Sequence, residues 1–129
     1  MKLQKIVARL QKLHPKEIDL SLDRTKNLCK KIGNPQDQIK CISIIGTNGK
    51  YSTIQALYAI FKEANYKCNI YTSPHIKKIN ERFFYNNKTL TDDKLANLLS
   101  EVEEINNGEK ITFFEILTVA YFHYAKKYP

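Results

Sequence analysis

Between residues 41 and 61 the sequence passes from an apolar run, through a tight loop, into an amphipathic helix. The run 41–45 is short, nearly all apolar and β-branched, which predicts a strand buried on both faces. The loop reads Gly46-Thr47-Asn48-Gly49-Lys50, and the apolar residues after it recur at helical spacing. A strand, a glycine-containing turn and a helix in this order form the place where many proteins cradle phosphate groups.

The residue types of this loop suit phosphate. Glycines let backbone N–H groups turn inward, the helix N-terminus adds positive potential, and Lys50 is long enough to reach terminal phosphates. A hydroxyl just after the lysine can bind the magnesium ion that travels with ATP. The common phosphate-loop pattern is not met, because Ile44 replaces its first glycine and Tyr51 replaces its Ser or Thr. The alternative is an ordinary strand-to-helix turn with an incidental lysine.

The rest of the chain predicts one α/β unit without repeats or linkers. Helices are expected over 3–13, from about 22 to 32 with Ser21 as N-cap and Gly33 as stop, from the loop to Asn65, from Thr91 to Asn107, and from about Thr112 onward. Further strands are expected at 67–72, 82–85 and 88–90, the last two forming a hairpin around Asn86-Asn87. The order strand, helix, strand over 41–72 implies a parallel pair.

The formal charge of +8 raises the hypothesis of nucleic-acid binding. The lysines are spread over nearly every segment, which is more typical of a solvated surface, and there is no aromatic-basic motif. No stretch is apolar enough to span a membrane, and lysines and an arginine interrupt the start of the chain where a signal peptide would be apolar. Cys29, Cys41 and Cys68 lack metal-ligand spacing, so we expect reduced, mostly buried thiols in a cytoplasmic protein.

Several segments, in the same order, resemble the folylpolyglutamate synthase/dihydrofolate synthase family, a branch of the Mur ligases. The loop Gly-Thr-Asn-Gly-Lys-x-Ser-Thr is similar to the short phosphate loop of these enzymes. The other matching segments are Ile18-Asp19-Leu20-Ser21-Leu22-Asp23-Arg24, Tyr71-Thr72-Ser73-Pro74-His75-Ile76, Asn80-Glu81-Arg82 and Thr112-Phe113-Phe114-Glu115. The resemblance covers essentially the whole chain. It implies a P-loop-type parallel sheet with flanking helices, the Mur-ligase central domain, with residues 1–129 forming its partial N-terminal ATP-binding part.

The resemblance also implies an ATP-dependent ligase. Similar enzymes transfer the γ-phosphate of ATP to a carboxylate of dihydropteroate or of a folate, and the amine of L-glutamate attacks the resulting acyl phosphate. ATP, Mg²⁺, dihydropteroate or folate, and L-glutamate are therefore the expected ligands, with no nucleic acid or membrane partner; the full-length family is expected to be monomeric. A non-catalytic nucleotide- or pterin-binding module and a basic nucleic-acid-binding protein remain as alternatives.

The resemblance assigns the site residues. The nucleotide-binding set is Gly46, Thr47, Asn48, Gly49, Lys50, Tyr51, Ser52 and Thr53. The catalytic set is Lys50, Ser73 and His75, with Ser52 and Ser73 as magnesium ligands. The substrate-binding set is Asp19, Leu20, Ser21, Thr112, Phe113, Phe114 and Glu115. Arg82 is a further candidate, for anchoring the loop at Ser73 or for holding an anion.

Some of these residues also have purely structural interpretations. Ser73-Pro74 suits an ordinary turn after a strand, Ser21 a helix cap, and Thr112-x-x-Glu115 a capping box. Two features depart from the family pattern. Tyr51 stands where the folate branch usually has glycine, which raises the question of volume beside the phosphates. The chain stops at Pro129, before a strand and a C-terminal domain of the family, so we expect that it does not complete the reaction alone.

Overall fold

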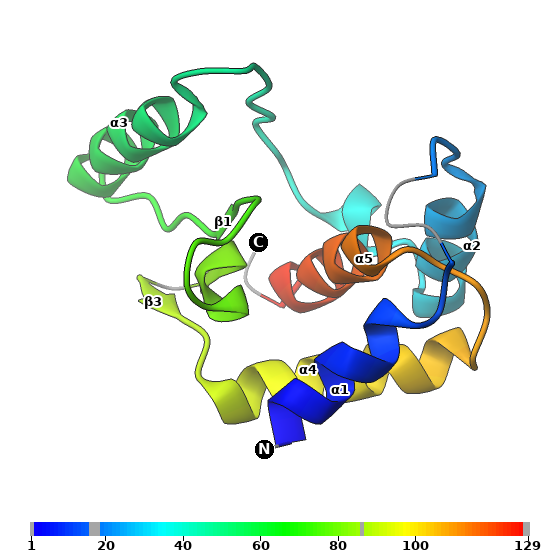
Figure 1. Ribbon diagram of the computed structural model, residues 1–129. Coiled ribbons are helices and arrows are strands. Elements are labelled where there is room, and N and C mark those ends of the chain that lie inside the picture. The colour runs from blue at the N-terminus through cyan, green and yellow to red at the C-terminus, as the bar shows by residue number, and fades with distance from the viewer. Residues whose placement is uncertain (1, 16–18, 86, 128–129) are drawn as a thin grey trace. The chain divides into compact units, whose positions relative to one another are not determined.

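The computed structural model describes residues 2–15, 19–85 and 87–127 (Figure 1). They divide into two compact units. The helical unit comprises Met1–Ile39 and Leu90–Pro129, and the loop unit comprises Lys40–Thr89. Among the described residues, no helix combines the length and the apolar character that crossing a membrane requires.

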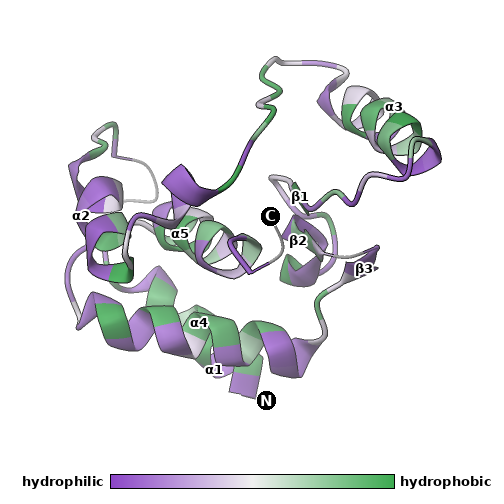
Figure 2. Ribbon diagram, turned by 180° about the vertical axis from the view of Figure 1, so that it is seen from behind, coloured by the Kyte–Doolittle hydropathy of each residue, from purple (hydrophilic) through white to green (hydrophobic). Residues whose placement is uncertain are grey.

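In its described residues, the helical unit contains the α-helices α1 (Lys2–Gln11), α2 (Asp23–Ile32), α4 (Asp92–Asn106) and α5 (Phe113–Ala125) and the short 3₁₀ turn η1 (Pro35–Gln38). Helix α1 packs on α4, and α5 packs on both α2 and α4. Figure 2 shows hydrophobic and hydrophilic residues alternating along α4, as expected for a helix with one buried face. The core consists mainly of Leu3, Ile6, Leu10, Leu28, Ile32, Leu95, Leu98, Leu99, Val102, Ile116, Leu117 and Val119.

The ends of these helices lie close to where the sequence predicts them. The Thr91 hydroxyl accepts a hydrogen bond from the Lys94 N–H at 3.3 Å, and Asn107 ends α4 with φ of 53°. Gly33 ends α2 with φ of 93°, a conformation that glycine adopts without strain. The Ser21 prediction is wrong by one position. Leu22 is the N-cap of α2, and the Ser21 hydroxyl accepts from the Asp23 N–H at 3.2 Å.

The loop unit contains α3 (Lys50–Glu63), β1 (Ile70–Tyr71), η2 (Ile79–Arg82), β2 (Phe83–Tyr85) and β3 (Lys88–Thr89). The three strands form one sheet in the order β1-β2-β3, and both pairs are antiparallel. Phe84 lies opposite Ile70 on one side and Thr89 on the other. The predicted hairpin is thus confirmed. Of its predicted turn, Asn87 has φ of 66° and Asn86 lies outside the described residues.

The predicted parallel sheet is not confirmed. Residues 41–45 form no strand in the described part of the chain, and Ile42 and Ile45 are 66% and 92% exposed instead of buried. The predicted strand 67–72 shortens to β1, and its hydrogen-bonded neighbour is β2 in antiparallel orientation. The physical reason is that an apolar run becomes a strand only when a second strand supplies its backbone partners. Cys41 is accordingly exposed, whereas Cys29 is buried as expected and Cys68 is half-buried.

Candidate functional site

The loop at Gly46 leads directly into the N-terminus of α3. Gly46 and Gly49 have φ of 152° and 77°, and Gly49 is the N-cap of the helix. The first intrahelical hydrogen bond runs from the Thr53 N–H to the Gly49 carbonyl at 3.0 Å. The N–H groups of the preceding helical residues therefore have no partner within the helix. No acidic residue occupies the first turn, so nothing there opposes a phosphate.

The side chains of this loop face solvent. Lys50 is exposed, and so are the hydroxyl-bearing residues Thr47, Ser52 and Thr53. Tyr51 is 69% exposed, so its ring does not fill the space within the loop. The volume that Tyr51 adds relative to glycine therefore lies outside the loop. These residues fit a nucleotide: a lysine for its phosphates, and hydroxyl oxygens of the kind that coordinate magnesium together with phosphate oxygens.

The apolar face of α3 is the one that the sequence predicts. Ile54, Leu57, Tyr58 and Phe61 are half-buried, and the other residues of the helix are exposed. The Tyr58 ring meets Phe84 of β2 edge-on, with 5.5 Å between centroids, and its hydroxyl donates to the Asn87 side chain. These contacts hold α3 against the small sheet of the loop unit.

The segment Ser73–His75 follows β1 and contains a cis peptide bond between Ser73 and Pro74. Ser73 is exposed. Just before it, the Thr72 N–H donates to the Arg82 carbonyl and the Thr72 hydroxyl to the Glu81 carbonyl, each at 3.2 Å. The two segments that match the family around His75 and around Glu81 are therefore in direct contact, although neither match alone implies it.

Glu81 and Arg82 fix the chain after Pro74. The Glu81 carboxylate accepts from the backbone N–H groups of Ile76, Lys77 and Lys78 at 2.9 to 3.0 Å, and these bonds lower the pKa of its carboxyl group. Arg82 Nε donates to His75 Nδ1 at 2.8 Å. Because the guanidinium only donates, Nδ1 must accept, and the proton of the neutral ring then sits on Nε2. The loop-anchoring role considered for Arg82 is thus supported.

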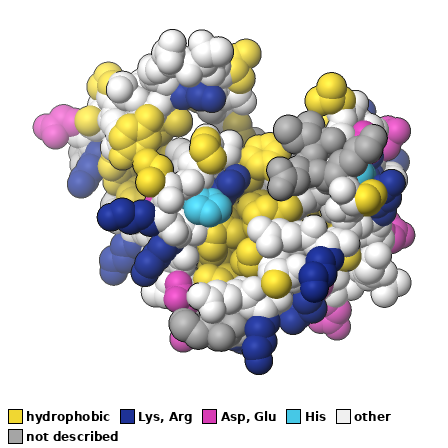
Figure 3. All heavy atoms as spheres, in the orientation of Figure 1, with side chains coloured by type: hydrophobic (Ala, Val, Ile, Leu, Met, Phe, Trp, Pro, Cys, Tyr) yellow, Lys and Arg dark blue, Asp and Glu magenta, His cyan; other side chains and the backbone are white. Residues whose placement is uncertain are grey.

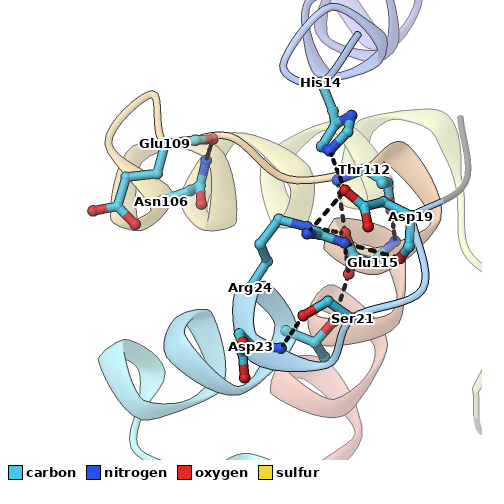
Figure 4. Close-up of polar contacts among 10 residues, drawn as sticks. His14, Asp19, Ser21, Asp23, Arg24, Asn106, Glu109, Thr112 and Glu115 are labelled. Atoms are coloured by element: carbon cyan, nitrogen blue, oxygen red, sulfur yellow. Dashed lines mark hydrogen bonds and ion pairs between the residues drawn. The ribbon is translucent and has the colours of Figure 1, made fainter. Parts of the chain in front are cut away.

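A polar cluster in the helical unit joins the two predicted substrate segments (Figure 4). It consists of His14, Asp19, Arg24, Thr25, Thr112 and Glu115. Arg24 Nε and Nη2 donate to the two oxygens of Glu115 at 2.9 and 3.1 Å. Arg24 Nη2 also reaches the Asp19 carbonyl at 2.9 Å, and Nη1 lies 3.3 Å from Asp19 Oδ2. The segments around Asp19 and Glu115 are therefore neighbours in space.

The Thr112–Glu115 capping box is confirmed. The Glu115 N–H donates to the Thr112 hydroxyl at 3.3 Å, and the Thr112 N–H donates to Glu115 Oε1 at 2.9 Å. Partial burial raises the pKa of the Glu115 carboxyl, but hydrogen bonds from Arg24 and Thr112 outweigh it and leave the pKa below its ordinary value of 4.5. The carboxylate of Glu115 is thus held in its charged form.

Large apolar side chains beside this cluster in sequence remain exposed. Leu20 is 97%, Leu22 67% and Phe114 47% exposed, while Phe113 is half-buried. Ile18 lies outside the described residues. No site role was predicted from the sequence for His14 or Arg24. Arg24 had one signal, its place at the end of a matching segment, but its partner Glu115 is 91 positions away.

The predicted site residues thus form two groups. Asp19, Ser21, Thr112 and Glu115 belong to the helical unit, and the phosphate loop, Ser73 and His75 belong to the loop unit. Within the described ranges no three His, Cys, Asp or Glu side chains are grouped to hold a metal ion. On the face drawn in Figure 3, lysine and arginine side chains occur at several places among other side chains.

Curated proteins that are similar in sequence to this chain carry the names dihydrofolate synthase or folylpolyglutamate synthase. The dihydrofolate synthase/folylpolyglutamate synthase of Haemophilus influenzae is 34% identical over 118 residues, which are 92% of this chain and 27% of that protein. The dihydrofolate synthetase of Saccharomyces cerevisiae is 32% identical over 109 residues, 83% of this chain and 26% of that protein. The chain therefore spans about a quarter of the length of these relatives. No protein-family model matches it.

Solved structures that are similar to this chain come from enzymes of the same kind. Folylpolyglutamate synthetase from Lactobacillus casei superposes with a TM-score of 0.86 at 27% identity, over 98% of this chain and 34% of that one. Escherichia coli FolC in complex with DHPP and ADP superposes with a TM-score of 0.83 at 29% identity, over 97% of this chain and 30% of that one. Fold and sequence therefore point to the same relatives.

Proposed function

The chain is a homologue of the folylpolyglutamate synthases and dihydrofolate synthases, and from this premise we propose that it carries the ATP-phosphate site and part of the pterin site of a glutamate ligase. The reaction is the addition of L-glutamate to dihydropteroate or a folate at the expense of ATP. The observation that carries the proposal is the loop at Gly46: two glycines at positive φ, N–H groups at the start of α3 that have no partner within the helix, and an exposed Lys50.

In this proposal the loop unit binds the nucleotide. The residues from Gly46 to Thr53 surround the phosphates, with Lys50 neutralising charge on the terminal groups. Ser52 and Ser73 supply hydroxyl oxygens for magnesium, and His75, held by Arg82, presents its Nε2–H as a hydrogen-bond donor. When bound, Mg-ATP supplies the phosphoryl group that turns a substrate carboxylate into an acyl phosphate, which an amine can attack.

The helical unit contributes to the substrate site. Asp19 and Ser21 offer polar groups, and Leu20 and Phe114 offer exposed apolar surface, which together suit a flat heteroaromatic ring with N–H groups. The Escherichia coli relative holds DHPP and ADP, which supports ligands of these two kinds for this chain. The oxygens of Glu115 are already occupied by Arg24, Thr25 and Thr112, so its role here is to support the site rather than to contact the ligand.

Lys50→Ala tests the nucleotide site. Mg-ATP at about 100 times its dissociation constant should stabilise the wild-type chain by about 2.7 kcal/mol, seen as a rise in melting temperature. We expect the variant to lose this rise while keeping its melting temperature without ligand, because Lys50 is exposed. The matched control is Lys67→Ala, which removes the same charge from an exposed position of the same unit and should retain the rise.

An unchanged Mg-ATP response in Lys50→Ala would refute the phosphate-loop assignment. In the same samples, ADP release that depends on both dihydropteroate and L-glutamate would identify a ligase.

A further inference from the structure

Arg24 makes two sets of contacts that no local pattern requires. Its guanidinium donates two hydrogen bonds to the carboxylate of Glu115, which lies in the first turn of α5. The same group reaches back to the Asp19 carbonyl and lies against Asp19 Oδ2, in the segment that enters α2. Two parts of the chain that are 91 positions apart are thereby held by one side chain. A planar fork of this kind fixes orientation as well as distance.

The turn formed by Asp19–Ser21 is held by contacts with Arg24 and with His14. The Asp19 carbonyl accepts from the Ser21 N–H at 2.9 Å in addition to Arg24, and Asp19 Oδ2 lies 3.1 Å from His14 Nε2. His14 is almost fully buried, with 2% of its side chain exposed, whereas the Asp19 side chain is 35% exposed. Both contacts of the Asp19 carboxylate go to Oδ2. Among the described residues Oδ1 takes no hydrogen bond or ion pair, so it remains open to a ligand N–H.

Glu115, in contrast, has no capacity left for a ligand. Oε1 accepts from Arg24 Nε and the Thr112 N–H, and Oε2 accepts from Arg24 Nη2 and the Thr25 hydroxyl. A carboxylate oxygen has two lone pairs, so both are filled. The side chains of the pair are largely sequestered, with 19% of Arg24 and 12% of Glu115 exposed. The pair therefore acts on the arrangement of its neighbours and not on a ligand.

We propose that Arg24 is the positioning residue of the substrate site: it holds the Asp19–Ser21 turn against the start of α5 so that Asp19 Oδ1 accepts a hydrogen bond from the pterin ring of the substrate. The inference rests on the proposed function, because the ligand is the pterin part of dihydropteroate. It adds to the proposed function which residue contacts the ligand and which residues hold that residue in position. Asp19 contacts the ligand, and Arg24 with Glu115 keeps Asp19 in place.

The chain offers a matched control for Arg24. Arg9 forks onto Glu103 with Nε and Nη2 at 3.0 and 2.8 Å, the same two-bond geometry within the same unit. That pair lies at the surface, with 55% and 26% of the side chains exposed, and joins α1 to α4. Arg9→Lys and Arg24→Lys thus each remove a two-bond contact between an arginine and a glutamate, and each keeps the positive charge. Only the second touches the Asp19 turn.

The experiment is calorimetric titration of the full chain with 7,8-dihydropteroate, well below the melting temperature of each variant. Arg24→Lys should weaken binding about tenfold or more, and Arg9→Lys should change it less than about twofold. Glu115→Gln is the second variant, because glutamine preserves the capping box but not the ionic fork, and it should follow Arg24→Lys. The Mg-ATP shift of Arg24→Lys should equal that of the wild type.

The outcomes separate this inference from the proposed function. If the wild-type chain does not bind dihydropteroate, the proposed pterin site is wrong and the inference falls with it. If the wild type binds and Arg24→Lys binds equally well, only the inference is overturned. Equal weakening in Arg24→Lys and Arg9→Lys also overturns it, because the effect would then be general destabilisation of the helical unit.

Discussion

Glu115 serves two purposes with one carboxylate: it closes the first turn of α5 and it holds Arg24. The contact with Arg24 depends on its negative charge, and the bonds from Arg24 and Thr112 keep its pKa below 4.5 despite partial burial. The capping half of this role follows from the spacing of Thr112 and Glu115 in the sequence. The contact with Arg24 does not follow from the sequence, because no local pattern relates residues 91 positions apart.

The charge on Glu115 predicts an acid-sensitive contribution to stability. A carboxyl group whose pKa is lower in the folded chain stabilises it above the unfolded value, and that contribution disappears as the pH falls through the folded pKa. The ordinary value here is 4.5, so the loss should occur below it. We expect the free energy of unfolding in urea to fall more steeply below about pH 4.5 for the wild type than for Glu115→Gln.

The matched control for this titration is Glu104→Gln, which changes an exposed glutamate of α4 and should follow the wild-type curve. Parallel curves for the wild type and Glu115→Gln across this range would show that the folded chain does not hold the Glu115 charge as the contacts indicate.

At the scale of single elements, the helices follow from the sequence and the long-range strand does not. Caps, apolar spacing and left-handed end residues such as Asn65, Asn107 and Gly33 act within a few positions, so a local pattern suffices to predict them. The hairpin of β2 and β3 is local for the same reason. A parallel partner for 41–45 would have to come from elsewhere in space, and no pattern along the chain specifies it.

The N-cap of α4 gives a test at this scale. Thr91 is exposed and its hydroxyl accepts from the Lys94 N–H, so Thr91→Ala should remove that bond without disturbing the core. The expected loss is about 1 kcal/mol in the free energy of unfolding. Thr91→Ser keeps the acceptor oxygen and should remain within a few tenths of a kcal/mol of the wild type. A loss of similar size in both variants would mean that the hydroxyl is not the source of the stabilisation.

At the scale of the whole chain, the predicted site divides between two compact units. The residues proposed for the nucleotide, with Ser73 and His75, lie in the loop unit, and the residues proposed for the pterin lie in the helical unit. The family resemblance gave both sets of residues from the sequence. The sequence alone did not reveal the contacts that support them, namely Arg82 on His75 and Arg24 on Glu115, because their separations of 7 and 91 positions match no local capping pattern.

The most direct test of the account is to record amide chemical shifts of the labelled full chain during titration with Mg-ATP. If the N–H groups of this loop and Lys50 contact the phosphates as proposed, the largest changes should fall on residues 46–53. The amides of α4, in the other unit, should serve as an internal reference and stay in place. Changes spread over lysines throughout the chain, with residues 46–53 unaffected, would mean that the nucleotide is attracted only by net charge and would contradict the account.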